Sequence, residues 1–385
     1  MNKSILHPPT PNLSQQLKQY PLAVKLAAVI YSGFAFGIGL SKGYLFHPHA
    51  FVAQFHLKSF ILMRVFLSAL ATAAFVKGVI SLIPGACERF RCARGYCFDL
   101  PNQKLLVYVG SFIFGIGVYL SGSCPGTTIS QLGSRVSSAI PAILGGLLAS
   151  IVVGLLKPSF NNYKPKQVFD MKANTLDVKF HIPFHYFAFA MSALMFFIVF
   201  LIEFFFPTIK DLQQFDGLIT MDYHSIWGML KNEVWPPWIC GIIIGTAQIP
   251  VILIALNEMG SATGYNVFIV RILDKIWPEY FKKHPYFSGA FGGFESYWQV
   301  PYLFAVAVGA SFTRVTSESF FPIQGLHPFI AFIGGFISIF GAKTCGGCAS
   351  GNGLSGMTSL SIRSMIAIGG MFAGGFFAAF VFPLI

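Results

Sequence analysis

Charged side chains are scarce in this chain, and their scarcity excludes the common classes of soluble protein. Lysine, arginine, aspartate and glutamate make up 10% of its 385 residues, whereas a soluble globular domain carries about 25%. A compact body of this size would lack the polar surface that keeps an ordinary enzyme in solution. The 43 phenylalanines exclude a disordered chain. The seven cysteines are too few and too scattered for a secreted disulfide scaffold.

Other absences narrow the class further. The sequence has no Walker motif or other ATP-binding pattern, so ATP-driven transport would need another subunit. The polar first 20 residues contain no hydrophobic core before a small-residue cleavage site, so we expect no signal peptide. The net charge is +12. Basic residues in a membrane protein usually lie in its cytoplasmic loops, so we expect no nucleic-acid partner. These exclusions leave a polytopic membrane protein of all-α fold that lies in the lipid bilayer.

Long apolar runs fit this class. A membrane-spanning helix needs about 20 mostly apolar residues, and nine segments approach that length. They are 22–41, 59–83, 104–121, 136–156, 183–206, 237–256, 299–317, 327–343 and 364–384.

Loop charges predict the orientation. Segment 84–103 carries three arginines and segment 157–182 carries five lysines, whereas 207–236 has four acidic residues against two lysines. The positive-inside rule places the first two segments and the N-terminus in the cytoplasm, and the third segment outside. We therefore expect an integral protein of the plasma membrane.

An internal repeat divides the chain. Cys124 and Cys348 lie 224 positions apart, and the same offset pairs Gly110 with Gly334 and Gly122 with Gly346. With one odd span between them, the two halves would be inverted in the membrane, as is common in secondary transporters. The predicted division is a cytoplasmic tail at 1–21, a first repeat at 22–156, a linker at 157–236 with the span 183–206, and a second repeat at 237–385.

Each repeat carries a stretch rich in glycine and cysteine after a hydrophobic segment. Irregular backbone at membrane depth is tolerated only where it is buried in protein or lines a wet cavity. We expect a short re-entrant helix after each stretch, whose N-terminus would attract an anion. The small residues could instead serve only close helix packing. The candidate pathway residues are Gly122, Cys124, Pro125, Gly126 and Thr127 in the first stretch, and Cys345, Gly346, Gly347, Cys348, Ser350, Gly351 and Asn352 in the second.

Lys343 is a further candidate, because a lysine inside a membrane is costly and by default functional. It lies five residues before Cys348 and could act as the counter-charge of an anion, or it could snorkel to an interface. Glu203 and Glu258 are the only acidic residues near the spans, so the sequence shows no obvious proton relay and leaves the coupling ion open.

The two cysteine stretches resemble signatures of the YeeE/YedE sulphur-transport family of thiosulfate importers. Residues 341–356 resemble its second signature and 120–127 its first, and 257–264, beginning at Asn257, is similar to a polar stretch of its second half. The resemblance implies an hourglass of inverted repeats. It also implies a non-enzymatic relay in which the thiols of Cys124 and Cys348 pass thiosulfate along a central pathway without a cofactor or metal. The family usually has another cysteine early in the first half, but residues 41–48 contain none.

Alternatives follow from that difference and from the remaining cysteines. The substrate could be another sulfur or selenium species, with Lys42 or His47 in place of the absent thiol. Cys345 and Cys348 form a C-x-x-C, so a membrane thiol oxidoreductase or sulfurtransferase is the alternative function. Cys87, Cys92 and Cys97 lack the spacing of a zinc site. We interpret them as reduced, inert loop cysteines; a sulfur-accepting role next to the transport exit is the alternative, with a cytoplasmic sulfur-acceptor protein as a candidate partner.

Overall fold

The computed structural model describes residues 19–96, 104–160, 175–216, 226–277, 279–317 and 322–382. Across these ranges the chain is helical, and its β-structure is limited to two isolated bridges. This confirms the all-α class expected from the apolar runs.

Long helices occupy all nine predicted spans. They are α2 (Leu22–Lys42), α4 (Ile61–Leu82), α6 (Lys104–Ser121), α8 (Ala139–Phe160), α11 (Phe184–Phe205), the broken helix α14–α15–η1 (Pro237–Thr246, Gln248–Pro250 and Val251–Ala255), α19 (Gln299–Thr316), α20 (Pro328–Cys345) and α21 (Ile362–Val381). Among the described residues, eight helical stretches are long and apolar enough to cross a membrane, and α19 is not among them. By composition the count is therefore eight rather than nine. The α19 helix carries Gln299, Thr313 and Arg314 and buries much of its surface in the protein.

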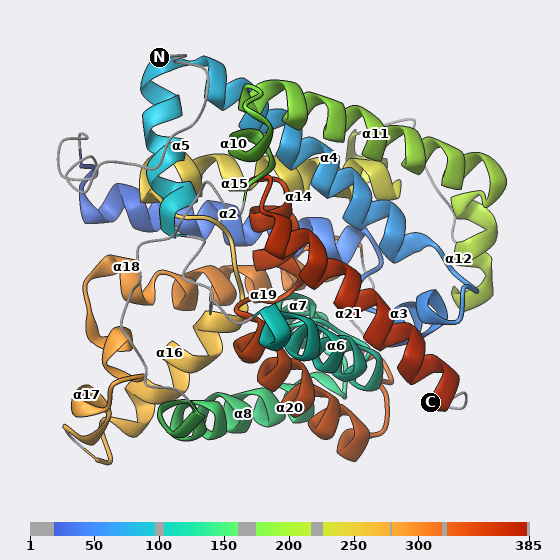
Figure 1. Cartoon of the computed structure of the whole chain (residues 1–385). Helices are drawn as coiled ribbons and strands as arrows, with labels where there is room; N and C mark the ends of the chain where they lie inside the picture. Colours follow the sequence, from blue (N-terminus) through green and yellow to red (C-terminus); the bar gives the residue numbers. More distant parts are fainter. Residues whose placement is uncertain are drawn as a thin grey trace.

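Shorter helices connect these spans. They are α3 (Pro48–Phe55), α5 (Pro84–Tyr96), α7 (Pro125–Gly133), α10 (Leu176–Phe180), α12 (Thr208–Asp216), α13 (Ile226–Lys231), α16 (Ala262–Leu273), α17 (Tyr280–Lys283), η2 (Ser288–Phe291), α18 (Phe294–Tyr297) and the π-helix η3 (Ser350–Met357). In Figure 1, α5 lies near the start of α2, and α3 and α12 lie at the opposite end of the molecule, near the end of α21.

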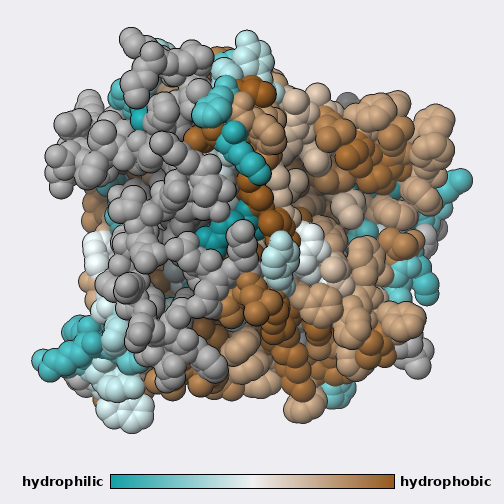
Figure 2. All heavy atoms as spheres, viewed as in Figure 1, coloured by the Kyte–Doolittle hydropathy of each residue, from teal (hydrophilic) through white to brown (hydrophobic). Residues whose placement is uncertain are grey.

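The outer surface suits a lipid environment. Exposed phenylalanines lie along α11, at Phe197, Phe200 and Phe204. Two more, Phe377 and Phe380, lie in the last part of α21. Figure 2 shows hydrophobic spheres spread over this part of the visible face, with hydrophilic residues at its edges. A face of this kind is stable in contact with acyl chains, which confirms the prediction of an integral membrane protein.

The helices that precede the two cysteine stretches cross each other symmetrically. A Cβ placed on Gly110 would meet Thr344 and Cys345, and one on Gly334 would meet Leu120 and Ser121. Shifting each residue of the first contact by 224 positions, to its counterpart in the other repeat, gives the second contact with the two helices exchanged. Because the first half of each helix lies against the end of the other, α6 and α20 run antiparallel. Such a crossing is what two halves related by a twofold axis in the membrane plane produce.

Other helix pairs also have a counterpart in the opposite repeat. Helix α2 packs along α19, and α14 packs along α4; the glycines on those faces are Gly33 and Gly37 in one pair and Gly241 and Gly245 in the other. Likewise α20 packs on α8 while α6 packs on α21. The repeat in the sequence is therefore also a repeat in packing, with the α6–α20 crossing at its centre. The exact domain boundaries stay a prediction.

Candidate functional site

Both helices of the central crossing end at a glycine in the left-handed region. Gly122 has φ +59° and Gly346 has φ +89°. Residues with a Cβ rarely adopt this conformation, so glycine at these two positions lets the chain turn sharply before each cysteine. Irregular backbone therefore begins at the same point in both halves, as the sequence predicted.

Hydrogen bonds repeat across the two turns. Ser121 Oγ donates to Ser123 O at 2.9 Å, and Cys345 Sγ donates to Gly347 O at 3.1 Å, which is the same bond 224 positions later. The extra cysteine of the C-x-x-C thus occupies the position of a turn-closing serine. Its thiol is directed into its own turn.

A short helix follows each turn. The Thr128 N–H donates to Cys124 O and the Asn352 N–H donates to Cys348 O, both at 2.8 Å, so each cysteine lies at a helix N-terminus. At the other end, Ser134 N–H donates to Ser130 O, whereas the matching bond runs from Ser359 to Ser355, an offset of 225. The π-helical winding of η3 accommodates this one extra residue, and π-bulges frequently occur at functional sites.

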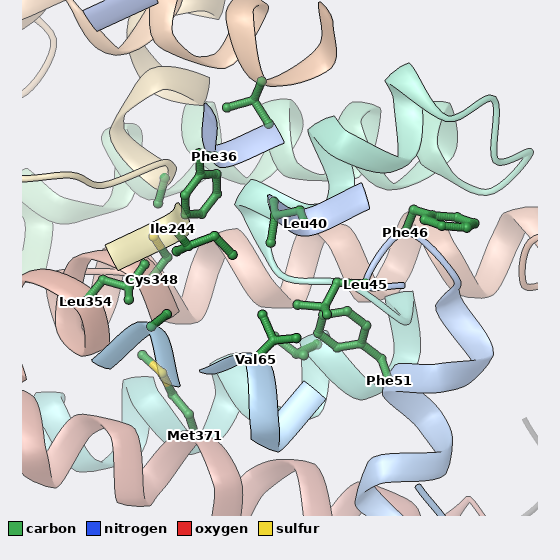
Figure 3. Close-up of a cluster of buried hydrophobic side chains, with 14 of the residues drawn as sticks. Phe36, Leu40, Leu45, Phe46, Phe51, Val65, Ile244, Cys348, Leu354 and Met371 are labelled. Atoms are coloured by element: carbon green, nitrogen blue, oxygen red, sulfur yellow. The ribbon is translucent and has the colours of Figure 1, made fainter. Parts of the chain in front are cut away.

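The two cysteine turns border one cavity in the interior of the protein. The cavity has a volume of about 100 Å³, and Cys124, Thr127, Ala349 and Ser350 lie on its wall. The rest of the lining is almost entirely apolar and includes Phe36, Leu40, Leu45, Phe51, Val65, Ile244, Leu354 and Met371. Figure 3 shows these side chains around the space, with Cys348 beside Ile244 and Leu354. Among the described residues, no lysine or arginine lines this cavity.

Hydroxyl groups connect the cavity wall to Cys348. Its thiol lies 3.2 Å from Ser350 Oγ, which lies 3.3 Å from Ser261 Oγ. The Tyr265 hydroxyl donates to Pro125 O at 2.9 Å and so ties the first cysteine turn to α16. Ser261 Oγ also lies against the first turn, 3.0 Å from the Cβ position of Gly126. Sulfur and oxygen donors of both repeats therefore share one small region.

Other predicted pathway residues lie outside the cavity lining. The Asn352 amide donates to Gly347 O at 2.7 Å and stiffens the second turn. Asn257 is bonded to Ala255 O and to Glu295. Lys343 is half-buried on α20 and does not line the cavity. The remaining candidates, Gly122, Pro125, Gly126, Gly346, Gly347 and Gly351, shape the two turns rather than the wall of the cavity.

A buried ion pair lies next to η3, and the sequence analysis did not assign it. The side chains of Lys77 and Glu258 are fully buried, and their charged atoms lie 3.0 Å apart. Lys77 Nζ also donates to Ser355 O, and the Ser359 hydroxyl donates to Glu258. The signal was available in sequence, because a lysine and a glutamate near spans are each costly alone and stable as a pair.

A second fully buried ion pair adjoins the first. Arg94 binds both carboxylate oxygens of Asp177 and donates to Ser359 O. Ser359, just after η3, thus connects the two pairs, with its hydroxyl on the first pair and its backbone carbonyl on Arg94. Helix α5 is fixed to the core through this contact, which explains why segment 84–103 begins as a helix.

Lys42 and His47, the two residues considered in place of the absent thiol, both lie outside the lining of the cavity beside the cysteine turns. Lys42 is buried, and its ammonium group donates to Leu230 O, Asn232 O and Ser317 Oγ, so it anchors the segment before α14. His47, His49 and His327 line a separate cavity of about 540 Å³. Gly122 lies against Pro48 and against Leu326, and Leu326 lines this cavity.

The described cysteines of the basic segment are not poised for reaction. Cys92 is buried and Cys87 is half-buried in α5, and burial raises the pKa of both thiols. A raised pKa reduces the thiolate fraction that attacks sulfur compounds. Cys97 lies outside the described residues. In the described ranges, no group of three histidine, cysteine or acidic side chains could hold a metal ion.

Comparison with known proteins decides the family. The family model described as sulphur transport matches residues 42–377, which include both cysteine turns and most of the residues that line the shared cavity. The chain belongs to the sulphur transport family. The sulphur transport match covers most of both repeats and confirms the resemblance seen in the cysteine signatures.

Two curated relatives are similar over a shorter region. A probable transporter of Xylella fastidiosa strain Temecula1 is 29% identical over 127 residues, covering 30% of this chain and 80% of the relative. A probable transporter of strain 9a5c is 28% identical over 145 residues, covering 35% and 90%. Both relatives are described as probable transporters, and both are much shorter than this chain.

Proposed function

We propose that this member of the sulphur transport family carries thiosulfate across the plasma membrane. The anion passes between the two cysteine turns, where the thiols of Cys124 and Cys348 hold it by weak S–H hydrogen bonds. One observation carries the proposal: residues of both turns lie on the wall of a single buried cavity at the interface of the repeats.

The chemistry of the cavity suits passage rather than tight binding. Conduction requires binding that is favourable enough to admit the anion and weak enough to release it. A thiol is a weak hydrogen-bond donor. The N-termini of α7 and η3 add partial positive charge. An anion held in this way would meet no fixed cation that traps it.

The route is expected to begin at the histidine-lined cavity and to continue past Gly122. This glycine lies against Leu326 of that cavity and two residues before Cys124. From the loop charges we expect the histidine side to face outside and the N-terminus to lie in the cytoplasm. Delivery of the product to a cytoplasmic sulfur-acceptor protein is part of the same proposal.

Uptake of ³⁵S-thiosulfate into proteoliposomes tests the function directly. We expect uptake well above that of protein-free liposomes, with competition by unlabelled thiosulfate. Sulfide, sulfate and selenate as competitors would rank the substrates. Folded protein that carries none of these anions would refute the proposal.

The oxidoreductase alternative makes a different prediction. It requires Cys345 and Cys348 to form a disulfide or a persulfide during turnover. The transporter proposal instead predicts that both thiols stay reduced while uptake proceeds. Intact-protein mass spectrometry after incubation with thiosulfate distinguishes the two, because each added sulfur or lost pair of hydrogens changes the mass.

A further inference from the structure

Both repeats contribute histidines to the wall of the histidine-lined cavity, which has a volume of about 540 Å³. His47 lies directly before α3 and His49 in its first turn, whereas His327 lies directly before α20. The segment that carries His327 is fixed to the first repeat, because the Ile323 N–H donates to Arg135 O at 3.1 Å. This cavity is therefore built at the interface of the repeats, as is the cavity between the cysteine turns.

One short segment of the first repeat contributes to the walls of both cavities. Within residues 45–51, Leu45 and Phe51 line the cavity beside the cysteine turns, whereas His47 and His49 line the histidine cavity. The histidine cavity thus adjoins the apolar cavity, and an ion that occupied it would lie next to the cysteine turns.

The polar groups of the histidine cavity suit an anion rather than a metal ion. The rings of His47 and His49 lie 5.5 Å apart, centroid to centroid. Nowhere in the described part of the chain could three histidine, cysteine or acidic side chains together hold a metal ion. Among the described residues no carboxylate lines this cavity, and Gln324 adds an amide. A protonated imidazole is a cation with two N–H donors, and both are groups that an oxyanion accepts.

We infer that the histidine cavity is a binding site for small sulfur oxyanions, and that it binds them more tightly as the histidines become protonated. The inference rests on the proposed function for the identity of the anion. It also assigns a role to His47, which lies in the segment 41–48 that lacks the family's usual cysteine. A site that acts through charge would collect the anion beside the two cysteine turns.

The sign of the pH dependence follows from the groups around the cavity. Histidine becomes cationic below about pH 6.5, and burial lowers the pKa of His49, so this ring takes up its proton in the lower part of that range. Five cationic side chains and three carboxylates are described on the surrounding elements, so the surroundings also favour an anion. The titratable and charged side chains there are Lys42, Tyr44, His56, Lys58, Tyr119, Arg135, Arg64 with its partners Glu203 and Asp211, and Arg314 with its partner Glu233.

Equilibrium binding of ³⁵S-thiosulfate to the full chain in detergent tests the site. We expect the wild type to bind about tenfold more tightly at about pH 5.5 than at about pH 8, equivalent to about 1.4 kcal/mol. His49→Gln combined with His327→Gln should lose most of this pH dependence. Both side chains are exposed, so the fold should tolerate the change. His185→Gln, on α11, is the matched control and should bind like the wild type.

A gain of charge tests the same site in the opposite direction. His49→Lys combined with His327→Lys should bind thiosulfate tightly at both pH values, because lysine stays charged throughout this range. Cys348→Ala should keep the pH dependence of the wild type, because the histidine cavity does not include this thiol.

The outcomes separate this inference from the transport proposal. Equal binding at both pH values in the wild type, or an unchanged pH dependence in the double glutamine variant, would overturn the histidine site even if proteoliposomes take up thiosulfate. Binding that depends on pH and on these histidines, in a wild type that transports nothing, would keep the site and refute the transport proposal.

Discussion

Single residues determine where the backbone leaves the helix and which groups meet in the cavity. Gly122 and Gly346 could be chosen from the sequence because glycine repeated at one offset beside cysteine. Ser261 could not, because it becomes significant only when α16 folds against the cysteine turns. Lys343 illustrates the opposite case: a lysine in an apolar run that the structure leaves outside the cavity lining.

The turn at Gly122 offers a prediction at this scale. In Gly122→Ala the new Cβ would be strained at φ +59° and would lie 2.7 Å from Pro48 Cβ. We expect the free energy of unfolding to fall by about 2 kcal/mol, since the left-handed region alone costs about 1–2 kcal/mol for a residue with a Cβ. Chemical denaturation in detergent measures this change.

Gly85→Ala is the control for that substitution. Gly85 lies in α5 and has open space around its Cβ position, so alanine there should leave stability unchanged or increase it slightly. Equal stability of the two variants would show that the Gly122 turn is less constrained than we describe.

At the scale of helices, hydrophobic runs predicted nearly every long element within a few residues. The nine expected segments all became helices because apolar length dominates helix formation in lipid. Residues 84–96 were expected to be a loop, yet they form α5, which is held by the Arg94–Asp177 contact between distant segments. The π-helical winding of η3 was not predictable either, since it depends on one residue inserted relative to the first repeat.

The buried pair that joins α4 to the segment before α16 is testable at this scale. Glu258→Gln would leave the Lys77 ammonium group without a carboxylate in the protein interior. Breaking a buried pair by removing one partner typically costs about 3–5 kcal/mol, so we expect a large drop in melting temperature. Differential scanning fluorimetry in detergent is the measurement.

An exposed pair supplies the comparison for Glu258→Gln. Glu279 and Lys283 form a solvent-exposed pair, so Glu279→Gln should have no measurable effect. Replacing both Lys77 and Glu258 by leucine should restore part of the lost stability. A stable Glu258→Gln protein would contradict the view that this pair holds η3 in place.

At the scale of the whole molecule, the inverted repeat explains why two distant cysteine turns border one cavity. The antiparallel crossing of α6 and α20 brings both turns to the interface of the halves, and each turn contributes to one cavity. The sequence showed the repeat and both turns. It did not show the apolar nature of the cavity or the burial of the charges beside it, which follow from tertiary packing.

Passage of thiosulfate between the two turns is the central claim, and the uptake of cysteine variants tests it most directly. Proteoliposomes with wild type, Cys124→Ala, Cys348→Ala and Cys240→Ala would be compared at equal amounts of folded protein; Cys240 is a buried cysteine on α14, outside both cysteine turns. We predict that Cys124→Ala and Cys348→Ala each lose about tenfold in initial rate, equivalent to about 1.4 kcal/mol, while Cys240→Ala transports like the wild type. Wild-type rates in both Cys124→Ala and Cys348→Ala would contradict the account.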